Sequence, residues 1–314
     1  MVGRKVGIVG AGFVGATAAY SLTMTGTCRE VVLYDINTDV AKGKALDIGQ
    51  SASYSPQGTI VTAAETAADL NDCDIVVITA GVPRKSDMTR ADLLMINAKI
   101  MKDVVGNIVK YSPNAIILCV SNPLDIMTYV IQKLTGWNRN RVIGMAGALD
   151  GARMSYQIHK TVGYGSGQIR AMLIGDHGQN MIPMPEISAV GGVPLSQLIS
   201  KEEMAGIIER TKDGGAEIVK HLGTSAYYAP GRAISVMVEA MLDDSRIVMP
   251  SSVILDGEYG YKDIAVGVPV VLGAHGVQEI IELDLDEETK AKFKVSVDSI
   301  QDGIDILTDN NFFK

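Results

Sequence analysis

The feature that most constrains the fold is a glycine motif close to the N-terminus, Gly10-Ala11-Gly12-Phe13-Val14-Gly15. It follows an apolar run over residues 6–9 and opens a helix-compatible segment. In a strand–turn–helix unit, Gly10 allows the tight turn and Gly12 lets main-chain N–H groups approach a pyrophosphate. Gly15 lets the helix pack closely against the strand. A flexible glycine loop has the same composition, so the motif needs support from its surroundings.

That support comes from Asp35, which follows Gly15 by 20 residues and ends a second apolar run, 30–34. A carboxylate at this place accepts hydrogen bonds from the hydroxyls of an adenosine ribose, whereas it repels a 2′-phosphate. The residues that follow, 36–39, contain no Arg or Lys that would reverse this preference. The sequence therefore predicts a dinucleotide site, with NAD rather than NADP as the cofactor.

The first half of the chain alternates short apolar runs with helix-compatible segments. Apolar runs without a period of two are typical of strands buried on both faces of a parallel sheet. The predicted strands are 5–9, 30–35, 74–81, 115–120 and 142–145, and the predicted helices include 14–25, 38–53 and 90–111. This order predicts an α/β, Rossmann-type doubly wound parallel sheet that binds ligands at the carboxyl ends of its strands.

The pattern changes after about residue 150. Helical segments mix there with short strands and glycine turns, and segments 264–274 and 277–283 are typical of antiparallel strands. A last helix is predicted after Asp286, with one apolar stripe formed by Phe293, Val297, Ile300, Ile304 and Leu307. We therefore expect a dinucleotide-binding domain over 1–145 and an α+β substrate domain over 146–314.

Charge limits the partners. The 314 residues carry a net charge of −8 and no run rich in Lys or Arg, which argues against nucleic acid and anionic membranes as partners. Beyond the N-terminal stretch that ends at Leu22, no apolar stretch is long enough to span a bilayer. The N-terminal apolar stretch resembles a secretion signal, but cleavage near Ala16-Thr17-Ala18 would remove the glycine motif. A cytoplasmic location is expected.

Cysteine and histidine spacing predicts no metal site. Cys28, Cys73 and Cys119 are scattered, as expected for a reducing compartment, and each is interpreted as a small buried hydrophobic residue. No two of the four histidines have the helical spacing of metal ligands.

A redox reaction on a dinucleotide also needs a group that moves a proton, and histidine is the usual choice. His159 lies in a helical pattern, His221 near a helix end and His275 in a glycine-flanked turn, where histidines are more often structural or solvated. His177 differs, because it follows a strand-like segment, 170–174, in a run with small neighbours that let a substrate approach. His177 is therefore the candidate acid/base.

Asp150 and Arg153 are the next candidates, because a spacing of three puts both on one helical face. The carboxylate can hold a histidine tautomer, and the guanidinium can bind a substrate carboxylate. Taken alone, the pair fits an ordinary surface ion pair better.

Two loops complete the candidate site. Arg84, Lys85 and Arg90 follow the strand 74–81 and form either a mobile anion trap or a solvated basic loop. Asn122 ends the next strand, where it can hydrogen-bond a substrate hydroxyl, and its bond to Pro123 can be cis in so tight a turn.

In combination, these residues resemble the 2-hydroxy-acid dehydrogenases, the family that contains lactate and malate dehydrogenases. The resemblance implies hydride transfer between a 2-hydroxy acid and NAD, with His177, Asp150 and Arg90 as catalytic residues. Substrate contacts would come from Arg84, Arg90, Asn122 and Arg153. The implied cofactor contacts are Gly10, Gly12, Phe13, Val14, Gly15, Asp35, Asn97, Val120 and Asn122.

The resemblance is strongest to the malate branch, since lactate enzymes tend to carry Gln at the position of Arg84. It implies a dicarboxylate substrate, malate or oxaloacetate, and a homotetramer or homodimer. A lactate or broad 2-hydroxy-acid dehydrogenase is the alternative, and a non-catalytic nucleotide-binding protein is a third interpretation. Two departures stand out: Ser86-Asp87 replaces the family's Pro-Gly, and Gln179 replaces the Asp that usually follows His-Gly.

Overall fold

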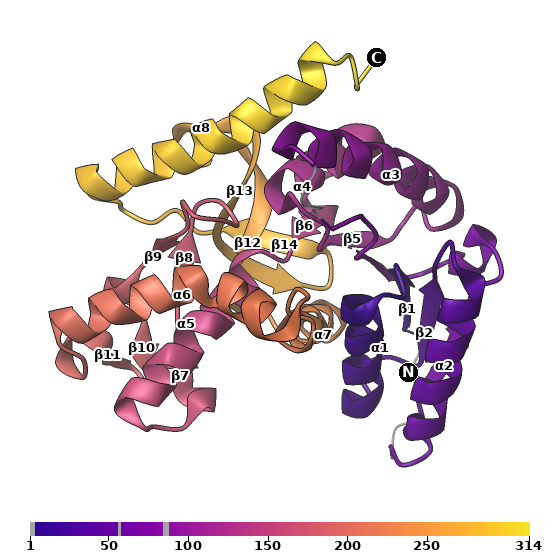
Figure 1. The fold of residues 1–314 in the computed structure, drawn as a ribbon, viewed down its shortest axis with the longest axis horizontal. Coiled ribbons are helices and arrows are strands. Elements are labelled where there is room, and N and C mark those ends of the chain that lie inside the picture. Colours follow the sequence, from indigo (N-terminus) through magenta and orange to yellow (C-terminus); the bar gives the residue numbers. More distant parts are fainter. Residues whose placement is uncertain (1–3, 56–57, 84–87) are drawn as a thin grey trace.

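A nine-stranded sheet runs through the computed structural model, which describes residues 4–55, 58–83 and 88–314 (Figure 1). The strand order is β14-β13-β12-β6-β5-β4-β1-β2-β3. The parallel strands are β1 (Lys5–Val9), β2 (Glu30–Tyr34), β3 (Ile60–Ala63), β4 (Ile75–Ile78), β5 (Ile116–Cys119) and β6 (Val142–Gly144). Their order, 3-2-1-4-5-6, is that of dinucleotide-binding Rossmann folds, with the switch point between β1 and β4. The predicted doubly wound sheet is confirmed.

Burial explains which strands the sequence revealed. Every residue of β4 and β5 is buried, so these strands read as continuous apolar runs. The prediction missed β3, an edge strand that pairs only with β2 in the described sheet. Ile60 of this strand is 53% exposed. An edge strand with an open face needs no apolar run, and so it carries little sequence signal.

Helices cover the two faces of the sheet (Figure 1). One group packs around α1 and comprises α1 (Phe13–Thr25), α2 (Thr38–Ala52) and α7 (Tyr228–Leu242). The other comprises α3 (Arg90–Tyr111), α4 (Leu124–Thr135) and α8 (Glu287–Asp309). α1 ends at Gly26, which has a left-handed conformation (φ 63°). As predicted, α8 follows Asp286, which is its N-cap, and the apolar stripe of α8 is buried.

The second half continues the same sheet. β12 (Ile247–Asp256), β13 (Lys262–Gly273) and β14 (Gly276–Ile280) are antiparallel, and Ser252 of β12 pairs with Gly144 of β6. The antiparallel strands predicted over 264–274 and 277–283 are confirmed, whereas β12 was not predicted. One hydrophobic core spans both halves, so the proposed boundary at residue 145 divides the chain without dividing the core.

The prediction of one strand over 170–174 was wrong. The segment forms two short strands in separate sheets: β7 (Ile169–Arg170) pairs with β10 (Ala189–Val190), and β8 (Leu173–Ile174) pairs with β9 (Ile182–Pro183). Met172 breaks the ladder, because its N–H bonds to the Ser188 side chain and its carbonyl accepts from Met184. The remaining elements are β11 (Val193–Pro194), α5 (Gly147–Val162), α6 (Lys201–Leu222), η1 (Ala67–Leu70), η2 (Arg139–Arg141), η3 (Ser166–Gln168), η4 (Pro185–Ile187), η5 (Leu195–Gln197) and η6 (Glu258–Gly260).

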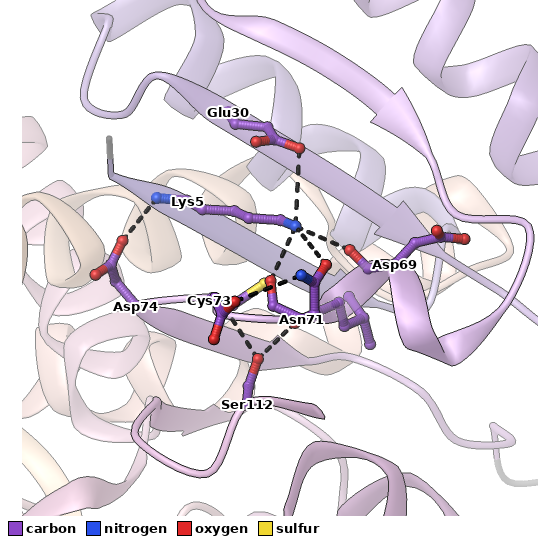
Figure 2. Close-up of polar contacts among 9 residues, drawn as sticks. Lys5, Glu30, Asp69, Asn71, Cys73, Asp74 and Ser112 are labelled. Atoms are coloured by element: carbon purple, nitrogen blue, oxygen red, sulfur yellow. Dashed lines mark hydrogen bonds and ion pairs between the residues drawn. The ribbon is translucent and has the colours of Figure 1, made fainter. Parts of the chain in front are cut away.

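A polar network closes the edge of the sheet where the parallel strands begin (Figure 2). Lys5 Nζ donates to the carbonyls of Asp69 (2.9 Å) and Asn71 (3.0 Å), and the Lys5 N–H donates to Asp74 Oδ2 (2.7 Å). Ser112 Oγ accepts from the Cys73 N–H at 3.0 Å. These bonds hold strand ends and loops together at the edge opposite the carboxyl ends of the strands.

The three cysteines are buried, as predicted. Burial raises the pKa of the Cys119 thiol to about 12, so it stays protonated at neutral pH. No helix in the described ranges combines the length and apolar composition that crossing a membrane requires.

Candidate active site

The glycine motif forms a tight turn between β1 and α1. Gly10 has a φ of 105°, and a Cβ atom there would lie 2.6 Å from Thr79 Oγ1. A Cβ atom on Gly15 would lie 1.9 Å from the Gly10 carbonyl oxygen, so only glycine permits this approach of helix and strand. Gly12 faces open space, and no side chain caps α1 at this residue. The first N–H groups of the helix are thus presented to a ligand rather than to a capping side chain.

A cavity of about 370 Å³ opens beside this turn, within the usual size range of ligand sites. Its lining includes Gly12, Asp35, Gly81 and Val82, from both sides of the switch point. Asp35 Oδ2 accepts from the Ala11 N–H at 2.7 Å, which fixes the carboxylate next to the turn. The open approach at Gly12 and the anchored acid fit a dinucleotide, with the pyrophosphate at the start of α1 and a ribose at Asp35.

Asn97 of α3 links the cavity to the end of β5. Its side chain is 1% exposed, accepts from the Val82 N–H (2.9 Å) and donates to the Asn122 carbonyl (2.7 Å). Because these bonds hold the main chain, Asn97 shapes the cavity wall, and direct contact with a cofactor stays a prediction. The Val120 N–H is bonded to Ile78, and the Asn122–Pro123 peptide is cis, as the tight turn suggested.

The structure joins the three residues that the sequence singled out separately. His177 Nδ1 lies 2.7 Å from Asp150 Oδ2, and Arg153 Nη1 lies 3.0 Å from Asp150 Oδ1. Asp150 is only 2% exposed, so the interpretation as an ordinary surface pair is wrong. The buried Asp150 carboxylate thus contacts both Arg153 and His177, and α5 carries both Asp150 and Arg153.

The electrostatics favour a protonated His177. Burial by itself lowers the pKa of the imidazole, but the charge and hydrogen bond of Asp150 outweigh it, and the pKa is raised above its usual 6.5. With Nδ1–H donating to Asp150, the exchangeable proton of the imidazolium sits on Nε2. This is the arrangement of a general acid/base held by a carboxylate.

Two further carboxylates near His177 were not predicted. Asp125, in the first turn of α4, accepts the His177 N–H with Oδ2 at 2.8 Å. Asp176 precedes the histidine and accepts from the Asn180 side chain at 3.0 Å. The available signal for Asp125 was a carboxylate two residues after Asn122-Pro123, close to the end of a strand, because strand ends meet at one edge of the sheet.

The remaining predicted residues divide into two groups. Arg90 is exposed and is the first residue of α3, after the N-cap Thr89, so it faces solvent in this structure. Arg84, together with Lys85, Ser86 and Asp87, lies outside the described residues. Its substrate role therefore depends on the sequence.

The other histidines occupy peripheral places. His159 Nδ1 lies 2.6 Å from the Tyr164 carbonyl beyond the end of α5, and His221 and His275 are exposed. Within the described ranges, no group of three or more His, Cys, Asp or Glu side chains is arranged to hold a metal ion.

The fold and the His–Asp pair define a two-domain oxidoreductase of the dinucleotide-binding class. Residues 4–144 match the lactate/malate dehydrogenase NAD binding domain, and residues 147–310 match the alpha/beta C-terminal domain of the same family. The chain belongs to the lactate/malate dehydrogenase family, whose members are NAD-dependent oxidoreductases.

Similar proteins come from both branches of the family. A malate dehydrogenase of Sulfurimonas denitrificans is 56% identical over 99% of this chain and 98% of its own length. The solved malate dehydrogenase from Salinibacter ruber has a TM-score of 0.93 at 41% identity and covers 98% of this chain and 100% of its own. A Cryptosporidium parvum lactate dehydrogenase complexed with lactic acid and nicotinamide adenine dinucleotide also scores 0.93, at 36% identity, over 98% of this chain and 99% of its own. Backbone similarity alone therefore does not separate the branches.

Proposed function

We propose that this chain is an NAD-dependent malate dehydrogenase that interconverts (S)-malate and oxaloacetate. The observation that carries the proposal is the buried Asp150 carboxylate, which contacts His177 at 2.7 Å and Arg153 at 3.0 Å. This cluster provides a proton donor and a carboxylate-binding cation within one hydrogen-bonded unit.

When bound, the nicotinamide supplies or accepts the hydride. The turn at Gly10, Gly12 and Gly15, with Phe13 and Val14 at the start of α1, would hold the pyrophosphate, and Asp35 would hold the ribose. Val120, Asn122 and the Val82 main chain, which Asn97 holds, would border the nicotinamide end.

In reduction, His177 Nε2 would donate a proton to the keto oxygen, and Asp150 would stabilise the imidazolium before the transfer and hold the ring in place. Arg153 would bind the substrate carboxylate next to the keto group. Its Nε is buried and has no hydrogen-bond partner among the described residues, so an anionic ligand would satisfy it. Asn122 would hydrogen-bond the reacting oxygen, and Arg90 would stabilise the developing alkoxide once it moves toward the substrate.

Charge favours a dicarboxylate as the substrate. Oxaloacetate carries a second carboxylate, which would be costly to bury without a cation. Arg84 is the proposed partner, and with pyruvate bound the same arginine would be enclosed without one. The malate dehydrogenases at 56% and 52% identity support this choice. Lactate dehydrogenase activity is the second candidate, favoured by the equal structural similarity to that branch.

The test of substrate compares oxaloacetate and pyruvate under one NADH-oxidation assay. We expect a strong preference for oxaloacetate, and Arg84→Gln should lower kcat/KM for oxaloacetate while raising it for pyruvate. Lys85→Gln removes a neighbouring charge and is the matched control. Equal efficiency with both substrates in the unaltered protein, or an unchanged ratio in Arg84→Gln, would refute the malate assignment.

Cofactor preference is a separate prediction. Asp35→Ser removes the charge that repels a 2′-phosphate and a hydrogen-bond acceptor for the ribose hydroxyls. The ratio of kcat/KM for NADH to that for NADPH should therefore fall by about tenfold or more. Asp39→Ser, four residues further along, is the control. Comparable use of both cofactors by the unaltered enzyme would contradict the role of Asp35.

We also propose a cytoplasmic homodimer or homotetramer. Leu46 of α2 is 67% exposed and Tyr228 of α7 is 70% exposed, as expected for surfaces that a second copy covers. Unpaired, buried cysteines agree with a reducing compartment.

A further inference from the structure

Several elements hold the loop that carries His177, among them α6, from which Lys212 donates to the Gln179 carbonyl at 3.3 Å. Gly175 exchanges two main-chain hydrogen bonds with Gly267 of β13, at 2.9 and 3.0 Å. Ser296 of α8 donates to the Asn180 carbonyl at 2.8 Å. Asp125 of α4 accepts from the His177 N–H itself, at 2.8 Å. Of these groups, Asp125 alone brings a negative charge, and it does so at His177 itself.

The Asp125 carboxylate has few partners for so buried a group. It is 5% exposed, and its Oδ1 has no hydrogen-bond partner among the residues that the structure describes. Burial raises its pKa to about 6, although the hydrogen bond from the His177 N–H and the nearby Ser252 hydroxyl oppose this rise. Of the charged groups that face it, His177 is cationic when protonated and Asp176 is anionic. An ion this poorly partnered is costly, which is uncommon unless it has a role.

The charged groups around His177 indicate a role for the Asp125 carboxylate. Asp150 and Arg153 face the imidazole from α5, and Asp125 faces it from α4. Arg153 takes one oxygen of Asp150, so this carboxylate is shared between two cations when His177 is protonated. The negative charge of the Asp125 carboxylate adds to that of Asp150 beside the imidazolium.

We propose that Asp125 is a positioning residue for His177, which fixes the main chain of the histidine and supplies the second negative charge that stabilises its imidazolium. The proposal builds on the proposed function, in which the imidazolium is the proton donor.

Asp125→Asn is the sharpest test, because it removes the charge while its Oδ1 can still accept the His177 N–H. Loss of a nearby opposite charge should lower the pKa of His177 by about one unit. The pKa is measured by NMR titration of the imidazoles in the full-length protein, with the His177 signal assigned from its absence in His177→Asn. In the reduction assay, kcat/KM falls as pH rises through this pKa, and that fall should occur about one pH unit lower in the variant.

Asp69→Asn is the control. It removes a carboxylate at the opposite edge of the sheet (Figure 2), and the His177 pKa should not move. An unshifted His177 pKa in folded Asp125→Asn would overturn the proposal, because the charge would then have no effect on the imidazole.

A reciprocal measurement covers the case in which Asp125→Asn does not fold. Coupling between two groups acts in both directions, so His177→Asn should raise the pKa of Asp125, followed by carboxyl ¹³C titration. An unchanged Asp125 titration would likewise overturn the proposal. Both titrations need no turnover. Absence of oxaloacetate reduction in the unaltered protein would therefore refute the proposed function, whereas normal reduction with uncoupled titrations would refute only the role of Asp125.

Discussion

Replacing His177 with Asn is expected to lower turnover of oxaloacetate by about 10²–10⁴-fold, the usual contribution of a positioned general acid. Asn retains much of the side-chain volume and can donate to Asp150, so the 2.7 Å contact has a substitute and the fold should persist. It cannot exchange a proton at neutral pH. Binding of NADH, which would use the glycine turn and Asp35, should change little.

Single-turnover kinetics and NADH fluorescence separate these two effects. His159→Asn is the matched control, because His159 contacts only the Tyr164 carbonyl among the described hydrogen bonds and lies beyond the catalytic cluster. Near-normal turnover in His177→Asn would mean that another group moves the proton, and His159, His221 and His275 would then need to be tested in turn.

Arg153→Ala is expected to damage the reduction of oxaloacetate and pyruvate alike. The substitution leaves the substrate carboxylate without a partner and removes a cation from the buried Asp150. Losing one member of a buried charge pair costs about 2–5 kcal/mol, so kcat/KM should fall by roughly 30-fold to several thousandfold. Arg153 also lowers the pKa of His177, so the pKa should rise in the variant.

Measurements at several pH values separate the loss of binding from this change in titration. Arg170→Ala is a suitable control, because the exposed Arg170 side chain donates only to the nearby carbonyls of Gly167 and Ile169 in the described contacts. If both substrates lose less than about threefold in kcat/KM, well under 1.4 kcal/mol, Arg153 does not bind the shared carboxylate.

The features that the sequence predicted, the glycine turn, the buried strands and the stripe of α8, depend on residues within one segment. The turn at Gly10 and the close packing at Gly15 both require a residue without a Cβ atom. A glycine at one position of the sequence is therefore enough to indicate each of them. Strands such as β4 are buried on both faces, and this burial demands continuous apolar residues. The stripe of α8 likewise follows from helical periodicity against the core.

The same reasoning failed where neighbours, rather than the segment, decide the structure. β3 lies at an edge and needs few apolar residues. The segment 170–174 divides because Met172 is bonded by Ser188 and Met184, residues more than ten positions further along the chain. A short stretch of sequence around Met172 contains neither Ser188 nor Met184, so it cannot indicate these bonds.

The sequence by itself determined the Rossmann-type sheet, a dinucleotide site at its glycine turn, and the identities of His177, Asp150 and Arg153 as candidates, because each depends on a residue type in a local pattern. Only the tertiary structure decided how they combine. His177 meets Asp150 across 27 residues and Asp125 across 52. Those contacts exist because α4 and α5 pack at the same edge of the sheet as the loop after β8, and no periodicity along the chain encodes that packing.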